Sequence, residues 1–367
     1  MTDAPPAVVV TGISGNLGRR LLPVLQGFRA VGVDFRPPQS DAPMRFVQMD
    51  LGLESSCLEL LQLIREVRPV AVVHLAFVLD AARMSVLDRD RMWQINVAGT
   101  ARVMEAVTEA NRDWPMVEKM IFMSSVAAYG SGLYQPATED RQLAAHGYIY
   151  GLHKMEADRV VQQRAPALRG CSAYILRPHI FAGPGIDNYF MEAFKGIPGG
   201  SSKRAAKMRA RGKRLPCVLP TGNQYLKNRI QFVHIEDVAR LLAHILNKKE
   251  PEAQRLTILN VAGRGSPLTF EQCVAMAHAK LLRVPGKWGF ELMLRALWSM
   301  RISTIPPDIA PYMLSDSVMD VSRLEEFLGA EYKNVIRYPV ADAFAACFKE
   351  WPRQIKAAAV ELSPSTK

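Results

Sequence analysis

A tyrosine and a lysine four residues apart could carry out proton transfer. Tyr150 and Lys154 lie in the run Tyr-Gly-Leu-His-Lys, and four residues make about one turn of a helix, so both side chains would share one face. An unperturbed tyrosine has a pKa near ~10 and is a poor base at neutral pH. A nearby ammonium group lowers that pKa toward the range in which acid–base catalysis works best. Tyr148 is a rival, but the residue four positions later is Leu152.

Three glycines near the start of the chain could form a phosphate-binding turn. Residues 8–10 are consecutive valines, which predicts a buried strand, and an apolar helical pattern begins near residue 17. The first glycine allows a tight turn, the second lets the backbone approach a pyrophosphate, and the third lets helix and strand pack closely. We expect this turn to bind a dinucleotide through Gly12, Ser14, Gly15, Asn16, Leu17 and Gly18.

The second predicted strand, residues 30–34, ends in a carboxylate that could select the cofactor. Asp34 lies 16 residues after Gly18, near the usual spacing for a residue that accepts hydrogen bonds from the adenosine ribose. A carboxylate there would repel a 2′-phosphate, which favours NAD over NADP. Arg36 argues in the other direction, because an arginine can accommodate that phosphate. Asp34 could instead be a loop residue that caps the next element.

Further motifs resemble a known enzyme superfamily. The glycine spacing is Gly-x-x-Gly-x-x-Gly, and Ser124-Ser125-x-x-x-Tyr129-Gly130 follows a predicted strand, 25 residues separating Ser125 from Tyr150. With the segments 74–77, 96–100, 177–185 and 232–239, these motifs resemble the extended short-chain dehydrogenase/reductase superfamily, in particular the NAD-dependent epimerase/dehydratase family. The resemblance covers about residues 7–261 and fades beyond them. Phe77 departs from the family, which has a small residue there.

The resemblance implies a hydride-transfer site. Ser125 matches the family's catalytic serine, Tyr150 would exchange a proton with a substrate hydroxyl or carbonyl, and Lys154 would hold the nicotinamide ribose. Tyr129 would contact the substrate. The resemblance gives structural roles to His74, His234 and Asp237, and no metal is expected. It further implies NAD contacts from Asp50, Leu51, Leu75, Ala76, Asn96, Tyr150, Lys154 and Pro178.

The substrate class stays open at this stage. Val126 and Ala127 stand where dehydratases of the family usually carry an acidic pair, which disfavours dehydration. Family resemblance favours an epimerase or oxidoreductase acting on a nucleotide sugar, although Ile180 replaces an asparagine that is frequent in such enzymes. The alternative is an NAD(P)-dependent alcohol or ketone oxidoreductase, similar to 3β-hydroxysteroid dehydrogenases, on an apolar substrate. A nucleotide-binding regulator without turnover is a remote alternative.

Composition places the chain among globular proteins. It has 367 residues, 49% of them hydrophobic, which excludes a disordered protein. No run of 18 apolar residues occurs, and residues 1–6 do not resemble a signal peptide. The five cysteines are scattered without a Cys-x-x-Cys pair, which fits reduced thiols and a cytoplasmic location.

The net charge of +11 is concentrated in one stretch. Residues 203–214 hold seven cations and no acid. They could form a solvated loop or frayed helix, a site for substrate phosphates through Arg209, Arg211 and Arg214, or a contact with an anionic surface. No aromatic residue interleaves with them, so nucleic acid is not expected. Residues 288–301, rich in Trp and Met, could pack on the protein, line an apolar pocket or lie on a membrane.

Alternating strands and helices predict an α/β fold with a Rossmann-type, doubly wound parallel sheet and a smaller C-terminal substrate-binding cap. Following the family's architecture, we expect an NAD-binding domain over 1–185 plus about 229–262 and a cap over 186–228 plus about 263–350. Residues 351–367 would form a tail. The resemblance also implies a homodimer, built through helices at roughly 88–111 and 148–165.

Overall fold

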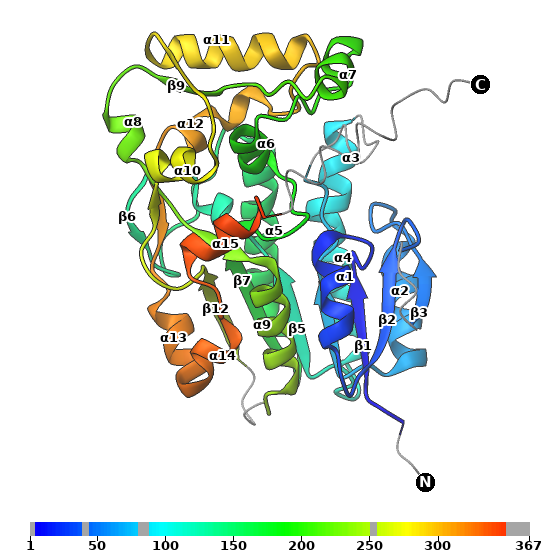
Figure 1. Ribbon diagram of the computed structural model, residues 1–367. Helices are drawn as coiled ribbons and strands as arrows, with labels where there is room; N and C mark the ends of the chain where they lie inside the picture. The colour runs from blue at the N-terminus through cyan, green and yellow to red at the C-terminus, as the bar shows by residue number, and fades with distance from the viewer. Residues whose placement is uncertain (1–3, 39–43, 80–87, 250–254, 350–367) are drawn as a thin grey trace, which may run out of the picture.

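The computed structural model describes residues 4–38, 44–79, 88–249 and 255–349 (Figure 1). Its largest sheet has seven parallel strands in the order β12-β7-β5-β4-β1-β2-β3. This order reverses direction beside β1, as in doubly wound sheets, and confirms the predicted fold class. The strands are β1 Ala7–Thr11, β2 Arg29–Asp34, β3 Arg45–Gln48, β4 Ala71–His74, β5 Lys119–Met123, β7 Ser172–Pro178 and β12 Leu256–Val261.

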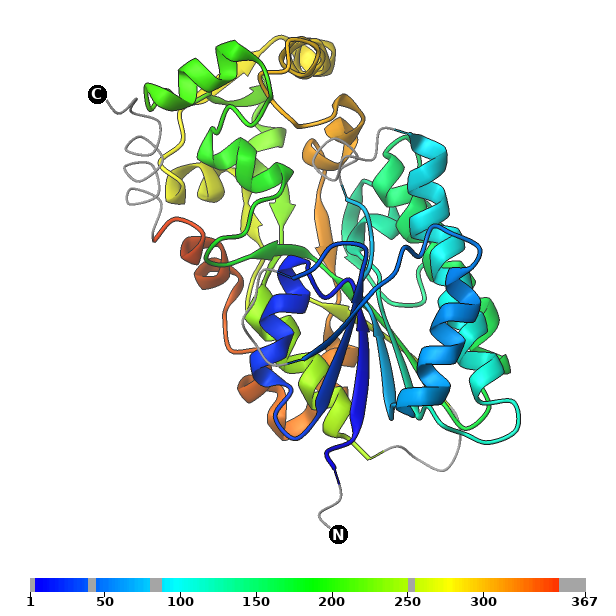
Figure 2. The ribbon, with the colours of Figure 1, turned by 90° about the vertical axis from the view of Figure 1, so that its right-hand side faces the viewer.

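Helices cover both faces of this sheet (Figure 2). Val8 and Val10 of β1 belong to one apolar cluster, whereas Val9 between them belongs to another. Because successive side chains of a strand point to opposite faces, an unbroken valine run is the pattern of a strand buried on both sides. One face carries α1 Asn16–Leu21 and α9 Ile235–Asn247, and the other carries α2 Ser56–Val67, α4 Gly99–Ala110 and α5 Ile149–Arg164.

A second group of elements lies above the sheet in Figure 1 and forms the cap. It contains a four-stranded sheet in the order β13-β10-β15-β6 and the parallel pair β9 and β14. Its strands are β6 Leu133–Ala137, β9 Cys217–Pro220, β10 Arg229–Ile230, β13 Leu268–Thr269, β14 Leu281–Val284 and β15 Ser317–Met319. Its helices are α6 Tyr189–Lys195, α7 Lys203–Ala210, α8 Gln224–Lys227, α10 Phe270–Met276, α11 Gly286–Ser299 and α12 Ala310–Met313.

Shorter elements complete the fold. A π-helix, Gln94–Ala98, continues α3 Arg89–Trp93 into α4, and strands β8 Ile180–Ala182 and β11 Phe232–His234 pair in parallel. Turns of 3₁₀ helix lie at Leu22–Val24, Val126–Tyr129, Ala165–Ala167, Pro307–Ile309 and Gly329–Glu331. None of the helices in the described ranges is long and apolar enough to cross a bilayer.

The last described helices return to the large sheet. α13 Ser322–Leu328 packs on β12, α14 Tyr332–Val335 on α9, and α15 Val340–Ala346 on β11. These helices lie within the segment expected to form the cap, but their packing joins them to the nucleotide-binding part. No motif in the sequence distinguishes them from cap helices.

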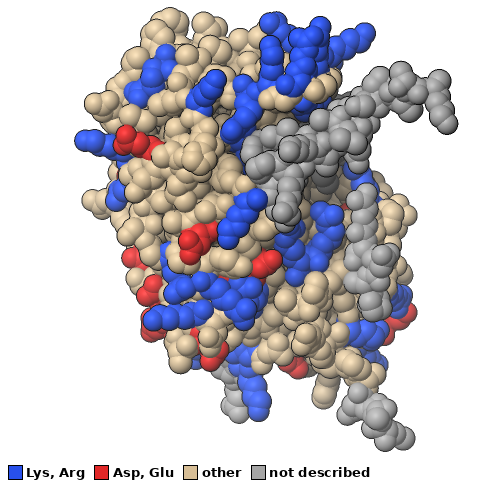
Figure 3. Space-filling view, in the orientation of Figure 1, with Lys and Arg blue, Asp and Glu red and all other residues tan. Residues whose placement is uncertain are grey.

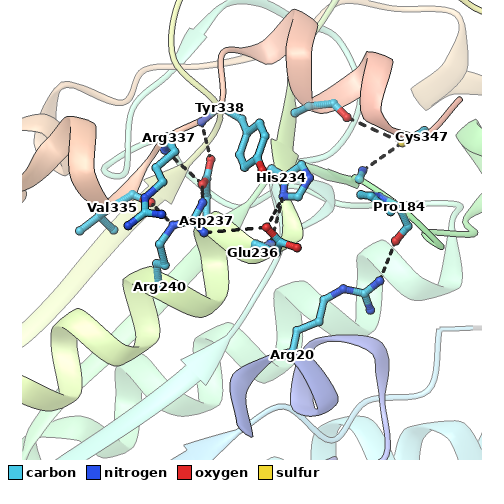
Figure 4. A network of polar contacts seen from close by, with 12 residues as sticks. Arg20, Pro184, His234, Glu236, Asp237, Arg240, Val335, Arg337, Tyr338 and Cys347 are labelled. Carbon is cyan, nitrogen blue, oxygen red and sulfur yellow. Dashed lines mark hydrogen bonds and ion pairs between the residues drawn. The ribbon is translucent and has the colours of Figure 1, made fainter. Parts of the chain in front are cut away.

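Figure 4 shows the polar contacts that join α9 to the segment between α14 and α15. The Asp237 carboxylate is fully buried, accepts the backbone N–H groups of Arg337 and Tyr338 at 3.1 and 3.0 Å, and pairs with Arg240. The His234 ring stacks on Tyr338 with 3.8 Å between centroids. His234 and Asp237 therefore hold α9 to the C-terminal segment. Within the described ranges, no group of three or more His, Cys, Asp or Glu side chains could hold a metal.

Candidate active site

A cavity of about 320 Å³ lies between the ends of the central strands and the cap. The glycine turn after β1 lines one part of it, and the start of α5 lines another. The structure thus joins the two motifs that the sequence singles out, although more than 130 residues of chain separate them. The predicted site residues in its lining are Gly12, Gly15, Asn16, Leu17, Gly18, Leu75, Ser125, Tyr150, Lys154 and Pro178.

The turn after β1 requires glycine at two of its three positions. Gly12 has φ +74°, and a Cβ there would lie 2.4 Å from the backbone nitrogen of Ala76. At Gly18 a Cβ would lie 2.4 Å from the carbonyl oxygen of Ile13. Side chains at either position would push the turn away from β4 or from the first helix. The backbone between them is left uncovered toward the cavity, as a dinucleotide pyrophosphate requires.

Asp34 lies beside this turn. Its carboxylate accepts the Ser14 backbone N–H at 3.0 Å, and the Ser14 hydroxyl donates to the Arg36 carbonyl at 2.7 Å. The end of β2 is therefore attached to the glycine turn, where a ribose next to the pyrophosphate would lie. The Arg36 guanidinium lies 4.8 Å from the centroid of the Phe35 ring. Asp34, Arg36 and Ser14 flank the cavity rather than line it.

Two other predicted cofactor residues support the loops around the site. Asp50 pairs with Arg91 and accepts the Gly52 N–H at 2.9 Å. The Asn96 amide accepts the Val78 N–H at 2.7 Å and donates to the Val78 carbonyl at 3.0 Å. Asn96 thereby fixes the segment after β4, which carries the lining residues Leu75, Phe77 and Leu79, and it acts on the cavity through that segment. Asp50, Leu51, Ala76 and Asn96 are not among the lining residues.

His74 links the sheet to a helix. Its two ring nitrogens lie 2.7 Å from the Thr11 hydroxyl and 3.0 Å from the Thr100 hydroxyl. Burial lowers the pKa of His74 to about 3, with a smaller contribution from Lys154. The ring is therefore neutral and bridges β1, β4 and α4.

Ser125, Tyr150 and Lys154 meet on one wall of the cavity. The Ser125 hydroxyl oxygen accepts the Ala127 N–H at 3.2 Å and so caps the 3₁₀ turn that ends β5. Tyr150 and Lys154 lie in the first two turns of α5. The Lys154 ammonium group donates to the Met123 carbonyl at 2.6 Å and lies 3.5 Å from the centroid of the Phe77 ring.

Burial governs the protonation of this pair. It lowers the pKa of Lys154 to about 7, opposed by the Asp158 carboxylate. It raises the pKa of Tyr150 to about 12, opposed by a hydrogen bond with Ser125. The expectation that Lys154 lowers the Tyr150 pKa is wrong, because burial raises that pKa and Ser125 is the group that opposes the rise. The lysine is buried enough to be half neutral near pH 7, so it supplies little charge to stabilise a phenolate.

Behind this wall lies a buried network of hydrogen bonds that the sequence motifs do not predict. The Arg177 and Asp158 side chains are each at most 1% exposed, and the guanidinium donates two hydrogen bonds of 2.9 and 3.0 Å to the carboxylate. Asp158 also accepts the Ser124 hydroxyl at 2.6 Å. Asp158 follows Lys154 by four residues on α5, so the helical period that pairs Tyr150 with Lys154 could have indicated it. Arg177 begins the segment 177–185 that carries the family resemblance, but its pairing with Asp158 is not predicted by that motif.

The predicted substrate residues lie away from the cavity. Tyr129 is 2% exposed, and its hydroxyl lies 2.7 Å from the Asn260 amide oxygen. Arg209 donates to the Pro198 and Gly200 carbonyls, and Arg214 donates to the Lys195 carbonyl at 2.8 Å. Arg211 is exposed at the end of α7. None of these four side chains is among the described residues that line the cavity.

Apolar and aromatic side chains of the cap form much of the remaining wall. Polar groups are interspersed among them at His179, Asp187, Asn188 and Ser317. A wall of this kind suits the uncharged part of a ligand, with a few groups to orient it. Its apolar and aromatic members are Ile180, Phe181, Ile186, Tyr189, Phe190, Ile309 and Tyr312.

The fold and site define a Rossmann-type enzyme with a tyrosine–lysine pair beside a dinucleotide cradle. Residues 8–262 match the model of the NAD dependent epimerase/dehydratase family, and the chain belongs to this family. Membership makes it an NAD-dependent enzyme and confirms the predicted superfamily and cofactor. The cradle agrees with that cofactor, because the uncovered glycine backbone and Asp34 offer what a pyrophosphate and an adenosine ribose need.

Two relatives match 63% of the chain. UDP-glucose 4-epimerase 4 of Oryza sativa subsp. japonica is 30% identical over 251 residues, which cover 63% of this chain and 65% of that protein. UDP-glucose 4-epimerase 2 of the same plant is 28% identical over 249 residues, covering 63% and 59%. The chain therefore spans less than two thirds of the length of these relatives.

Solved structures share the fold over nearly the whole chain. MoeE5 in complex with UDP-glucuronic acid and NAD superposes with a TM-score of 0.63 at 21% identity, covering 95% of this chain and 99% of MoeE5. UDP-glucose 4-epimerase of Thermotoga maritima, with UDP-glucose, gives 0.63 at 17% identity and the same coverage. At these identities the likeness concerns the fold, including the cap.

Proposed function

We propose that this enzyme catalyses hydride transfer at a secondary hydroxyl or carbonyl carbon, with Tyr150 as the acid–base group. The observation that supports the proposal most directly is the shared cavity, which brings Ser125, Tyr150 and Lys154 into one space with the glycine turn. NAD, when bound, supplies the hydride acceptor or donor. The cradle would be formed by Gly12, Gly18 and the neighbouring turn residues, with Asp34 at the ribose.

The side chains of the site would transfer the proton and orient the substrate oxygen. Tyr150 takes a proton from the substrate hydroxyl or returns it to the carbonyl oxygen, and Ser125 donates a hydrogen bond to that same oxygen. The Lys154 ammonium group is buried in the cavity wall, where its hydrogen bond to the Met123 carbonyl fixes its position. Burial raises the pKa of Tyr150 to about 12, so ionisation of the phenol requires positive charge or a hydrogen-bond donor nearby, and Ser125 is such a donor.

For the substrate, we propose a nucleotide sugar as the first class. The support is similarity: the relatives named above are UDP-glucose 4-epimerases, and the fold including the cap resembles enzymes solved with UDP sugars. Arg209 and Arg214 give this proposal no support, because they bind main-chain carbonyls away from the cavity.

A second class, an apolar alcohol or ketone, is favoured by the cavity itself. Ile180, Phe181 and Phe190 line the same cavity as Tyr150 and would exclude water from an apolar ring. Under either proposal, we assign substrate binding to the cap and cofactor binding to the part that contains the large sheet. Strand β6 then belongs to the cap, and helices α13–α15 belong to the cofactor-binding part, unlike in the boundaries predicted from the sequence.

A substrate panel decides between the two classes. Purified enzyme would be incubated with UDP-, GDP- and dTDP-sugars and, separately, with cyclic secondary alcohols and ketones, and products would be identified by chromatography and mass spectrometry. Interconversion of sugar epimers supports the first class, and net oxidation or reduction of the apolar compounds supports the second. Absence of turnover in both sets, with NAD bound, would favour a nucleotide-binding regulator.

We also propose a homodimer through α3, α4 and α5. These helices pack together, and the Trp93 indole, 39% exposed, meets the His153 ring edge-on at 5.4 Å. Because α5 carries Tyr150 and Lys154, association would help to fix the catalytic wall. Sedimentation equilibrium at micromolar concentration should give a dimer, and a fully active monomer would contradict this.

A further inference from the structure

Helix α11 turns an apolar face to solvent. Only Gly289, Phe290 and Leu294 of this helix are buried. Trp288, Leu292 and Trp298 are 67%, 59% and 51% exposed. At about 3.6 residues per turn, positions 288 and 292 lie about 40° apart and 298 lies about 80° from 288 on the other side, so the three side chains share the exposed half of the helix with Glu291 and Arg295. Met300, 47% exposed, and Leu282, 39% exposed, extend the apolar surface beyond both ends of the helix.

The basic helix α7 lies directly beside α11 (Figures 1 and 2). The Gly200 N–H donates to the Ile302 carbonyl at 2.9 Å, and the Ser202 N–H donates to the Arg301 carbonyl at 3.0 Å. These bonds join the start of α7 to the end of α11, so the two helices present one continuous surface. The exposed cations of this surface are Lys203, Arg204, Lys207, Arg211, Lys213, Lys287, Arg295 and Arg301.

Charge on this surface has one sign almost throughout. Figure 3 shows Lys and Arg gathered over α7 at the upper right, beside a tan surface over α11. Residues 201–214 contain no acidic side chain, and α11 contains only Glu291. An anionic partner would therefore meet cations beside exposed indoles, with little repulsion.

From this charge and apolar complementarity we propose that the α7–α11 surface docks on an anionic phospholipid bilayer. A helix with Trp and Leu on one side and cations around it is the pattern of a segment that lies in the membrane interface. Tryptophan prefers the headgroup level of a bilayer, and nearby Lys and Arg are attracted to anionic lipids. Arg209 of α7 and Arg214 beyond its end, which bind carbonyls within the cap, are not needed for this contact. The proposal does not depend on the substrate.

Vesicle binding of the full chain tests the proposal. Phosphatidylcholine vesicles with and without phosphatidylserine would be mixed with the protein and sedimented at low and physiological salt. We expect binding only with phosphatidylserine, weakened by salt. Lys203→Gln, Arg204→Gln and Lys207→Gln together should weaken binding by about 10²-fold, since each cation near the surface contributes roughly fivefold.

Matched tryptophan variants distinguish insertion of the α11 indoles into the bilayer from nonspecific adsorption of the protein. Trp288→Ser with Trp298→Ser should abolish vesicle binding, whereas Trp114→Ser should not, although Trp114 is 72% exposed outside this surface. Brominated lipids should quench the fluorescence of the wild type and of Trp114→Ser. Circular dichroism would confirm that each variant is folded.

Several outcomes would overturn the proposal. They are no sedimentation with phosphatidylserine vesicles at low salt, equal binding to neutral vesicles, and loss of binding in Trp114→Ser alone. Tighter binding to single-stranded oligonucleotides than to vesicles, removed by the same Gln changes, would assign the surface to nucleic acid. Self-association that the paired Trp changes remove, without vesicle binding, would assign it to a second copy of this chain.

Discussion

Burial of Lys154 predicts a pH dependence of stability that one substitution should remove. The pKa of this lysine is lowered from 10.5 to about 7 in the folded protein. Below about pH 7 both states hold the proton, and the folded protein bears the full cost of a buried ammonium. Between about pH 7 and 10.5 only the unfolded chain holds it, so the free energy of unfolding rises with pH. The rise is at most about 1.4 kcal/mol for each pH unit, or about 2 kcal/mol between about pH 7 and 9.

Urea unfolding of the cofactor-free protein at several pH values measures this rise. Lys154→Met removes the titrating group, so its free energy of unfolding should increase less over that interval, by about 2 kcal/mol, than that of the wild type. Other groups titrate equally in both proteins and cancel in the comparison. Lys213→Met, at an exposed position of the basic stretch, is the control and should follow the wild type. Equal pH dependence for Lys154→Met and wild type would show that Lys154 is not buried as described.

Two further predictions concern the cofactor and the network behind the site. Calorimetry should show tighter binding of NAD than of NADP. Asp34→Ala should narrow this difference in affinity, because it removes the carboxylate that faces a 2′-phosphate. Tighter binding of NADP by the wild type would mean that Arg36 governs this part of the site. Asp158→Asn should destabilise the protein in urea by about 3–5 kcal/mol, because it leaves the buried Arg177 guanidinium uncompensated. Asp140→Asn, whose carboxylate pairs with Arg323 at 78% exposure, should cost about 1 kcal/mol or less, and equal losses in the two variants would contradict the reasoning.

The nucleotide-binding part could be predicted from sequence because each of its elements carries local information. The valine run, the glycines and the strand-end polar residues have fixed spacing, and parallel strands bring their ends to one edge. The predicted strands at 8–10 and 30–34, and the helix predicted to begin near residue 17, agree with β1, β2 and α1. Gly12 and Gly18 are required by contacts with Ala76 and Ile13, which explains why the motif indicates the fold.

The cap and the protonation states could not be predicted in the same way. Arg209 and Arg214 look like phosphate ligands in the sequence, but their partners are carbonyls that only the folded chain brings near. The spacing of Tyr150 and Lys154 shows that they share a helix face and says nothing of the burial that sets both pKa values. The exposed Trp face of α11 likewise depends on which side of that helix the cap covers.

The measurement that tests the central claim most directly is turnover by Tyr150→Phe with NAD bound. The substitution removes the transferable proton and little else, so NAD affinity should be retained. Turnover of the substrate found in the panel should fall by at least ~10²–10⁴-fold. Tyr148→Phe, on the neighbouring ring 5.7 Å away, should lose far less. Near-normal turnover in Tyr150→Phe would contradict the assignment of this tyrosine as the acid–base group.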